Sequence, residues 1–155
     1  MMSQITLYSP ALEELSFRRA LLSDPDTMAY NHAYGGTIDF PPERWADWHR
    51  RWVEDPEGRF YRYLRSAEGF VGEAAYHFDG ELGGFLCDVI VHASHRGRGY
   101  GGQGLELLCQ AAGENGVERL YDDIALDNPS VGLFLRHGFR EVKRTEAYVL
   151  VARDL

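Results

Sequence analysis

Phe85-Leu-Cys-Asp-Val-Ile-Val-His-Ala-Ser-His-Arg-Gly-Arg-Gly-Tyr-Gly-Gly102 is the stretch of sequence that decides the fold. Its apolar first part, 85–91, resembles a strand, and the run 102–112 at its end has the apolar spacing of a helix. Glycines between strand and helix let the backbone adopt positive φ and approach an anion closely. The N–H groups and the dipole at a helix start favour negative charge. The stretch therefore predicts a phosphate-binding loop, to which Arg96 and Arg98 add positive charge.

Two well-known phosphate loops fit this stretch poorly. A P-loop ends in Gly-Lys followed by Ser or Thr, whereas this loop ends in Gly-Tyr-Gly-Gly. Gly97, Gly99 and Gly102 satisfy a dinucleotide fingerprint literally, and Asp122 and Asp123 follow at about the 20-residue spacing of an acidic ribose ligand. Too few residues follow the loop for the further βαβ units of such a domain. A nicotinamide dinucleotide enzyme is therefore only an alternative.

The loop resembles the acyl-CoA loop of the GCN5-related N-acetyltransferases, the GNAT family. Their signature is Gln/Arg-x-x-Gly-x-Gly/Ala, and Arg96-Gly-Arg-Gly99-Tyr-Gly101 fits it. A second segment, Leu126-Asp-Asn-Pro-Ser-Val-Gly-Leu-Phe-Leu-Arg-His-Gly-Phe139, resembles the family's later helix, which carries an Asn at its start and ends in Gly-Phe. Asn128 suits the N-cap of this helix. Counting back from Gly-Phe, however, Asp127 takes the place of the family's Asn. The matched segments cover about residues 85 to 143.

The resemblance implies a mixed α/β fold and acetyl-CoA as the acyl donor. The expected order is β-α-α-β-β-β-α-β-α-β around a mixed central sheet, in a single N-acetyltransferase domain spanning residues 1–155. The diphosphate would bind loop N–H groups, and the pantetheine would pair with the edge of strand 85–91. No metal is expected. The implied cofactor-binding residues are Val89, Ile90, Val91, Arg96, Gly97, Arg98, Gly99, Tyr100, Gly101, Gly102, Asn128 and Phe134.

Periodicity and turn residues predict the remaining elements. Strands are expected at 5–8, 60–65, 70–78, 85–91 and 120–126, with two more in 140–153. Helices are expected at 12–30 with an interruption near Ser23-Asp-Pro25, and at 42–53, 100–114 and 129–137. Residues 31–36 are expected to form a loop.

Two carboxylates are candidates for taking the proton of an acceptor amine. Asp88 interrupts an apolar strand, where burial without a partner would be costly. It marks either a strand distortion or a functional group. Glu73 has small neighbours, Gly72 and Ala74, and is either a plain outward-facing strand residue or a catalytic one.

The acceptor side of the site is harder to predict. Tyr30, His32 and Tyr34 are either solvated loop residues or part of a roof over the acceptor pocket, as the resemblance implies. Trp45 belongs to a stripe with Trp48 and Trp52, at helical spacing i, i+3 and i+7. The stripe is either a packing face or an aromatic wall for a cation.

Composition agrees with a globular enzyme. The 155 residues are 45% hydrophobic and 13% aromatic, with no membrane-length apolar run and no signal-peptide pattern. A net charge of −8 argues against nucleic acid as a partner. Cys87 and Cys109 are expected to be reduced and buried, which suits the cytoplasm. The expected partner is a small-molecule or peptide amine, with no membrane partner and a homodimer left open.

The predicted reaction is transfer of an acetyl group from acetyl-CoA to a primary amine by direct attack. Many relatives carry a tyrosine in the late helix to protonate the departing thiolate, and the equivalent residue here is Phe134. That difference supports an alternative, a non-catalytic acyl-CoA sensor on the same fold.

Overall fold

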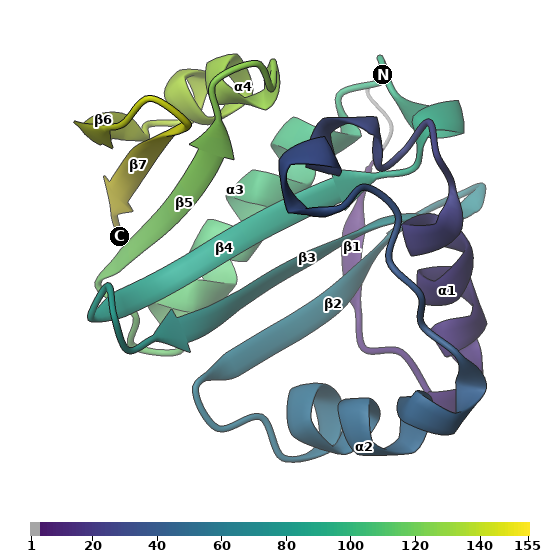
Figure 1. Ribbon diagram of the computed structural model, residues 1–155. Helices are drawn as coiled ribbons and strands as arrows, with labels where there is room; N and C mark the ends of the chain where they lie inside the picture. Colours follow the sequence, from purple (N-terminus) through teal and green to yellow (C-terminus); the bar gives the residue numbers. More distant parts are fainter. Residues whose placement is uncertain (1–3) are drawn as a thin grey trace.

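A seven-stranded mixed sheet forms the centre of the molecule, in the order β1-β2-β3-β4-β5-β7-β6. The structure is a computed structural model that describes residues 4–155, without the side chains of Ala33 and Tyr34. The β4–β5 pair is parallel and the other neighbouring strands are antiparallel (Figure 1). The strands are β1 Thr6–Tyr8, β2 Arg59–Ser66, β3 Gly69–Asp79, β4 Gly84–Val91, β5 Arg119–Ala125, β6 Arg140–Arg144 and β7 Tyr148–Asp154.

Helices cover both faces of the sheet. The α-helices are α1 Leu15–Ser23, α2 Trp45–His49, α3 Tyr100–Glu114 and α4 Ser130–Arg136. The 3-10 helices are η1 Leu12–Glu14, η2 Ala29–Tyr34, η3 Pro42–Arg44 and η5 Ala93–His95, and η4 Arg50–Glu54 is a π-helix. No helix among residues 4–155 is long and apolar enough to cross a membrane.

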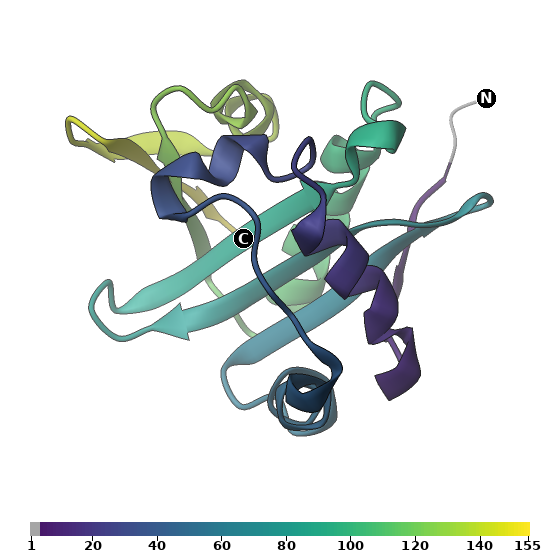
Figure 2. The same ribbon diagram turned by 45° about the vertical axis from the view of Figure 1, so that its right-hand side comes forward.

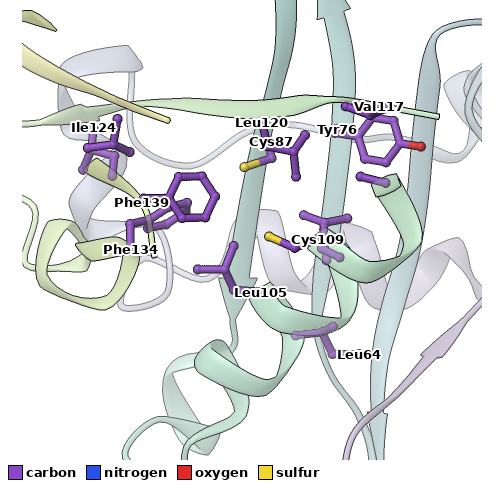
Figure 3. Packing of buried hydrophobic residues seen from close by; sticks show 14 of the residues in the cluster. Leu64, Tyr76, Cys87, Leu105, Cys109, Val117, Leu120, Ile124, Phe134 and Phe139 are labelled. Atoms are coloured by element: carbon purple, nitrogen blue, oxygen red, sulfur yellow. The ribbon is translucent and has the colours of Figure 1, made fainter. Parts of the chain in front are cut away.

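The alternation of side chains along the strands produces two separate cores. Leu64, Ala74 and Tyr76 point toward α3 and join the larger core. Tyr61 and Ala75 point the opposite way, toward α1 and α2, and join the smaller one. Cys87 of β4 and Cys109 of α3 lie in the larger core as free thiols, which confirms the expectation that they are reduced and buried (Figure 3).

The sheet divides where β4 and β5 part. They pair only through Phe85 with Leu120 and Leu86 with Tyr121. Beyond these residues the two strands diverge, β5 toward α4 and β4 toward the glycine-rich loop (Figure 1). The N–H of His92 bonds to Val71 of β3, so by alternation the backbone groups of Val89 and Val91 face the widening gap.

The predicted order of elements is confirmed, with differences at short helices. Residues 31–36 do not form an open loop, because 3-10 helix η2 continues to Tyr34 and the Asn31 amide bonds to the carbonyl of Gly36. The helix expected at 42–53 is present as three consecutive helical segments, 3-10, α and π, without a break between them. Only the β4–β5 pair is parallel among the strands of residues 4–155, so the nicotinamide alternative, which needs a parallel sheet, is wrong.

Candidate active site

A cavity of about 780 Å³ fills the gap between β4 and β5. Its walls are the backbone of β4 from Asp88 to Val91, β5 from Asp122 to Ala125, and the start of α4. The glycine-rich loop closes one end, and η2 lies beside this loop above β4, with the Tyr30 ring 5.7 Å from the Arg96 guanidinium (Figure 2). A volume of this size is typical of small-molecule and cofactor sites.

The glycine-rich loop has the backbone that an anion site requires. Gly97 and Gly99 have φ of 80° and 82°, a region that favours glycine. Gly99 is the N-cap of α3, so the free N–H groups of the first turn begin at this loop. A Cβ on Gly101 would lie 3.3 Å from Cδ2 of Leu133 in α4, so the loop and α4 meet closely across the cavity.

Of the two arginines in the loop, Arg96 lines the cavity and Arg98 does not. Arg96 lines it, but its guanidinium donates to the carbonyls of Asp26 and Thr27 at 3.3 and 2.7 Å. Arg98 does not line the cavity, because its Nη1 pairs with Glu68 at 2.5 Å. The side chain of Arg98 is therefore a poor candidate for a cofactor ligand, and Arg96 holds the loop against the segment after α1.

Asn128 and Phe134 both line the cavity from the α4 side. The Asn128 Oδ1 accepts a hydrogen bond from the N–H of Ser130 at 2.9 Å, although Pro129 and not Asn128 is the residue directly before α4. Phe134 is only 2% exposed, and its ring packs edge-on against Phe139 with 4.9 Å between centroids (Figure 3). Asp127 instead pairs with His32 of η2 at 2.6 Å, which links η2 to the α4 start.

A second cavity of about 290 Å³ lies on the α1 and α2 side of the sheet. Aromatic rings and carboxylates dominate its wall. The aromatic, basic and carboxylate side chains that line it are Arg18, Trp48, Trp52, Tyr61, Glu73, His77, Asp88, Asp122 and Asp123. The three aspartates line both cavities, so the cavities meet at this point. Sequence reasoning missed Arg18, Trp48, Trp52 and Tyr61 as site residues, and it considered Asp122 and Asp123 only as ribose ligands.

Glu73 belongs to a buried ion pair. Its carboxylate accepts hydrogen bonds from two donors, Nη1 of Arg18 at 2.6 Å and the hydroxyl of Tyr61. The Arg18 guanidinium lies 4.5 Å from the centre of the Trp48 ring and 5.0 Å from that of Phe40. Burial alone would lower the pKa of Arg18, and the charge of Glu73 more than offsets this and raises it. Glu73 is 3% exposed, so the outward-facing interpretation is wrong.

Asp88 lies where the two cavities meet. Register places it opposite Ala75, on the same face of the sheet as Glu73. Solvent reaches its side chain through the cavities, although protein atoms enclose the carboxyl group on its other sides. This enclosure raises the pKa of Asp88 to about 7, and the nearby charge of Glu73 adds to the effect. The position and the pKa both suit a group that exchanges protons near neutrality.

Asp122 and Asp123 extend this acidic wall onto β5. Burial raises the pKa of Asp122 well above its ordinary value, with Asp88 as the next cause. Burial also raises the pKa of Asp123. Within residues 4–155, none of Asp88, Asp122 and Asp123 has a cationic partner or a side-chain hydrogen bond.

The four predicted acceptor residues have different positions. Tyr30 lines the larger cavity, whereas Nε2 of His32 is hydrogen-bonded to Asp127. The side chain of Tyr34 lies outside the described part of the structure. Trp45 lines neither cavity, because its indole N–H bonds to the carbonyl of Phe40. The tryptophans that reach the smaller cavity are Trp48 and Trp52, whose rings stack at 5.8 Å. The stripe is thus a packing face that also forms one wall.

Comparison with known proteins agrees with this geometry. A family model described as the acetyltransferase (GNAT) family matches residues 19–139. A search of curated protein sequences gave no significant match. In the described residues there is no group of three or more His, Cys, Asp or Glu that could hold a metal ion.

Solved structures of acetyltransferases share the fold at low sequence identity. An acetyltransferase from Thermus thermophilus is 24% identical with a TM-score of 0.72, over 98% of this chain and 97% of that one. Spermidine N-acetyltransferase from Vibrio cholerae, in complex with CoA and spermine, is 15% identical with a TM-score of 0.80, over 97% and 95%. The PaiA N-acetyltransferase of Thermoplasma acidophilum, in complex with coenzyme A, is 9% identical with a TM-score of 0.73, over 98% and 99%.

Proposed function

The chain belongs to the GNAT family of acetyltransferases, and on this premise we propose that it transfers an acetyl group from acetyl-CoA to a primary amine of a small molecule or peptide. The observation that carries the proposal is the junction of the two cavities at Asp88. A long cofactor-sized cavity and a smaller acidic and aromatic one meet at a carboxyl group whose pKa is about 7. Donor and acceptor would enter from opposite sides and meet there.

The larger cavity fits a coenzyme A thioester. Positive-φ glycines and the start of α3 supply a cradle for its diphosphate. The backbone of Val89 and Val91 faces the gap and offers hydrogen bonds to an extended amide chain. Nδ1 of His95, a residue that lines the cavity beside the loop, is buried without a hydrogen-bond partner in the described residues. Two structural neighbours contain CoA, which supports the same donor class.

Acetyl-CoA, when bound, supplies an activated acyl thioester. The residues of this chain would then position the amine and remove its proton. The acidic wall favours an ammonium ion, and Asp88 in its ionised form would take a proton from it and leave the neutral nucleophile. A β4 N–H facing the gap would polarise the acyl carbonyl. A thiol has a pKa of about 8.5, so its departure needs little help from an acid.

The test is acetyl-CoA consumption by the purified protein across amines of different classes, together with acetyl-CoA binding by calorimetry. Binding and turnover with at least one amine support the proposal. The buried Phe134 favours one second candidate, an acyl-CoA sensor without catalysis. Tight binding with no turnover across the panel would favour that sensor, and absence of binding would contradict both functions.

Valine substitutions in the loop should weaken acetyl-CoA binding. Gly99→Val forces a β-branched residue to φ near 82°, and Gly101→Val pushes against Leu133 across the cavity. We expect each variant to raise the Kd for acetyl-CoA at least ~30-fold, which corresponds to about 2 kcal/mol. Calorimetry on the folded proteins measures this.

Two controls accompany these loop variants. Gly80→Val adds the same side chain at a turn where a Cβ meets nothing within 4 Å, and it should leave the affinity unchanged. Arg98→Ala should have little effect, because its guanidinium pairs with Glu68 outside the cavity. Unchanged affinity in both glycine variants would show that the diphosphate binds elsewhere.

A tyrosine at position 134 tests whether protonation of the thiolate limits the rate. Phe134→Tyr adds a hydroxyl at a buried ring that lines the larger cavity. We expect kcat to change by less than about threefold, because a thiolate with a pKa near 8.5 is already a good leaving group. A tenfold gain in kcat, about 1.4 kcal/mol of barrier, would mean that protonation is limiting. The Kd of the variant for acetyl-CoA separates this effect from disturbed packing.

A further inference from the structure

The acidic wall where the two cavities meet has more carboxyl groups than a single amine requires. Asp88, Asp122 and Asp123 line the junction of the two cavities, and none of them forms a salt bridge among residues 4–155, although Arg18 and His77 also line the smaller cavity. Like charges held close together without a bound counter-charge disfavour one another's ionisation. Glu73 does not add to this excess, because the Arg18 guanidinium already neutralises it. A ligand with more than one positive charge would favour the ionised form of these carboxyl groups, so the wall is complementary to such a ligand.

We propose that the acceptor is a small diamine or polyamine, one nitrogen of which is acetylated at Asp88 while a second, protonated nitrogen binds at Asp123. This inference rests on the proposed function and narrows its substrate class. Leu86 and Tyr121 are register partners in parallel strands, so Asp88 and Asp123, two residues further on, project to the same face of the dividing sheet. The two carboxylates thus flank the place where the strands part.

The remaining walls of the smaller cavity suit the same ligand. Trp48, Trp52 and Tyr61 line the same cavity as Asp123, and aromatic faces attract ammonium groups and cover alkyl chains. The volume of about 290 Å³ is close to the lower end of the range of small-molecule sites, about 300 Å³. That space accommodates a short aliphatic amine and is small for a folded protein segment.

An amino acid is the main competing acceptor, because Arg18 offers a cation to a carboxylate. The structure argues against this role. Arg18 lines the cavity, but Glu73, whose carboxylate lies 2.6 Å from Nη1, already neutralises its charge. A substrate carboxylate would also add negative charge beside three aspartates that already lack partners.

Three acceptors of equal length decide between these classes: 1,4-diaminobutane, 1-aminobutane and 4-aminobutanoate. They differ only in the group at the far end, which is an ammonium, a methyl or a carboxylate. With saturating acetyl-CoA, we expect kcat/KM for the diamine to exceed that for the monoamine at least tenfold, with the amino acid lowest. In Asp123→Asn the ratio of diamine to monoamine should fall at least tenfold. In Glu13→Gln, which removes an exposed carboxylate outside both cavities, the ratio should stay as in the wild type.

Equal kcat/KM for diamine and monoamine would overturn the proposal, as would a preference for 4-aminobutanoate. An unchanged ratio in Asp123→Asn would overturn the assignment of the second nitrogen to Asp123. If acetyl-CoA binds but no amine is acetylated, the proposed function fails separately. Calorimetry with 1,4-diaminobutane and 1-aminobutane then still decides the ligand class, because equal affinities would contradict the proposed dication site.

Discussion

Asp88→Asn is expected to lower kcat/KM for an amine at least ~100-fold at pH 7, the lower range for loss of a general base. The wild-type rate should rise with pH and level off above about 7, where Asp88 is ionised. The variant cannot accept the proton, so it depends on free amine from solution. An alkylamine with a pKa near 10.4 has about a hundredfold more free base at pH 9 than at pH 7. The defect should therefore shrink by about that factor between pH 7 and pH 9.

Steady-state rates across pH 6–9 measure this, and calorimetry checks that acetyl-CoA affinity is retained. Asp39→Asn is the matched control, because Asp39 is exposed and lines neither cavity. A variant whose pH profile runs parallel to that of the wild type, with a constant small defect, would show that the proton goes to another group or to water.

Asp88→Asn should lower the activity but raise the stability of the folded protein at alkaline pH. A carboxyl group has a pKa of about 3.9 in the unfolded chain, and the folded protein raises that of Asp88 to about 7. Such a group costs stability as pH rises between these two values, because the folded state holds the proton more tightly. We expect Asp88→Asn to have the same Tm as the wild type near pH 4 and a higher Tm at pH 8. Thermal scans at the two pH values measure this, and a lower Tm at pH 8 would contradict the direction of the shift.

Local signals explain why the second half of the fold could be predicted. The glycine-rich loop, the Asn128 side chain and the stop at Gly138 each act within a few residues, and the helices begin and end close to where these residues predict. Turn residues likewise predicted the β2–β3 hairpin. The short helices before β2 were predicted less accurately, because they depend on tertiary contacts more than on local propensity. The π-helix η4 packs on the smaller core through Trp52 and Val53, and η2 forms hydrogen bonds from Asn31 to Gly36 and between His32 and Asp127.

The acceptor side of the site depends on contacts that sequence spacing does not reveal. Arg18 and Glu73 meet although 55 positions separate them. Nothing in the stripe of tryptophans says that Trp48 and Trp52 face the cavity while Trp45 bonds to Phe40. The excess of carboxylates arises only because β4 and β5 part after two paired residues, which brings Asp88 beside Asp122 and Asp123. The interruption of an apolar strand by Asp88 was the one signal of this wall present in the sequence.

The Arg18–Glu73 pair should be the most sensitive point for stability. Arg18→Met leaves the Glu73 carboxylate buried with only the Tyr61 hydroxyl as a partner. Breaking a buried ion pair from one side costs about 3–5 kcal/mol, whereas replacing both partners with apolar residues is often nearly neutral. We expect Arg18→Met to lower the free energy of unfolding by about that amount and Arg18→Met/Glu73→Met to recover most of it. Urea denaturation measures both, and Arg19→Met, an exposed neighbour on α1, is the control.

The pair should also influence the proton acceptor. The positive charge of Arg18 lowers the pKa of Asp88, whereas Glu73 raises it. Loss of the Arg18 charge alone should therefore raise the pH at which kcat/KM stops rising to a value above 7. The profile is measured at a temperature where the variant is folded. In the double variant the two charge effects oppose each other, so the profile should return toward that of the wild type. A purely structural pair would change the stability and leave the pH of levelling in place, and that result would show that Arg18 and Glu73 do not tune Asp88.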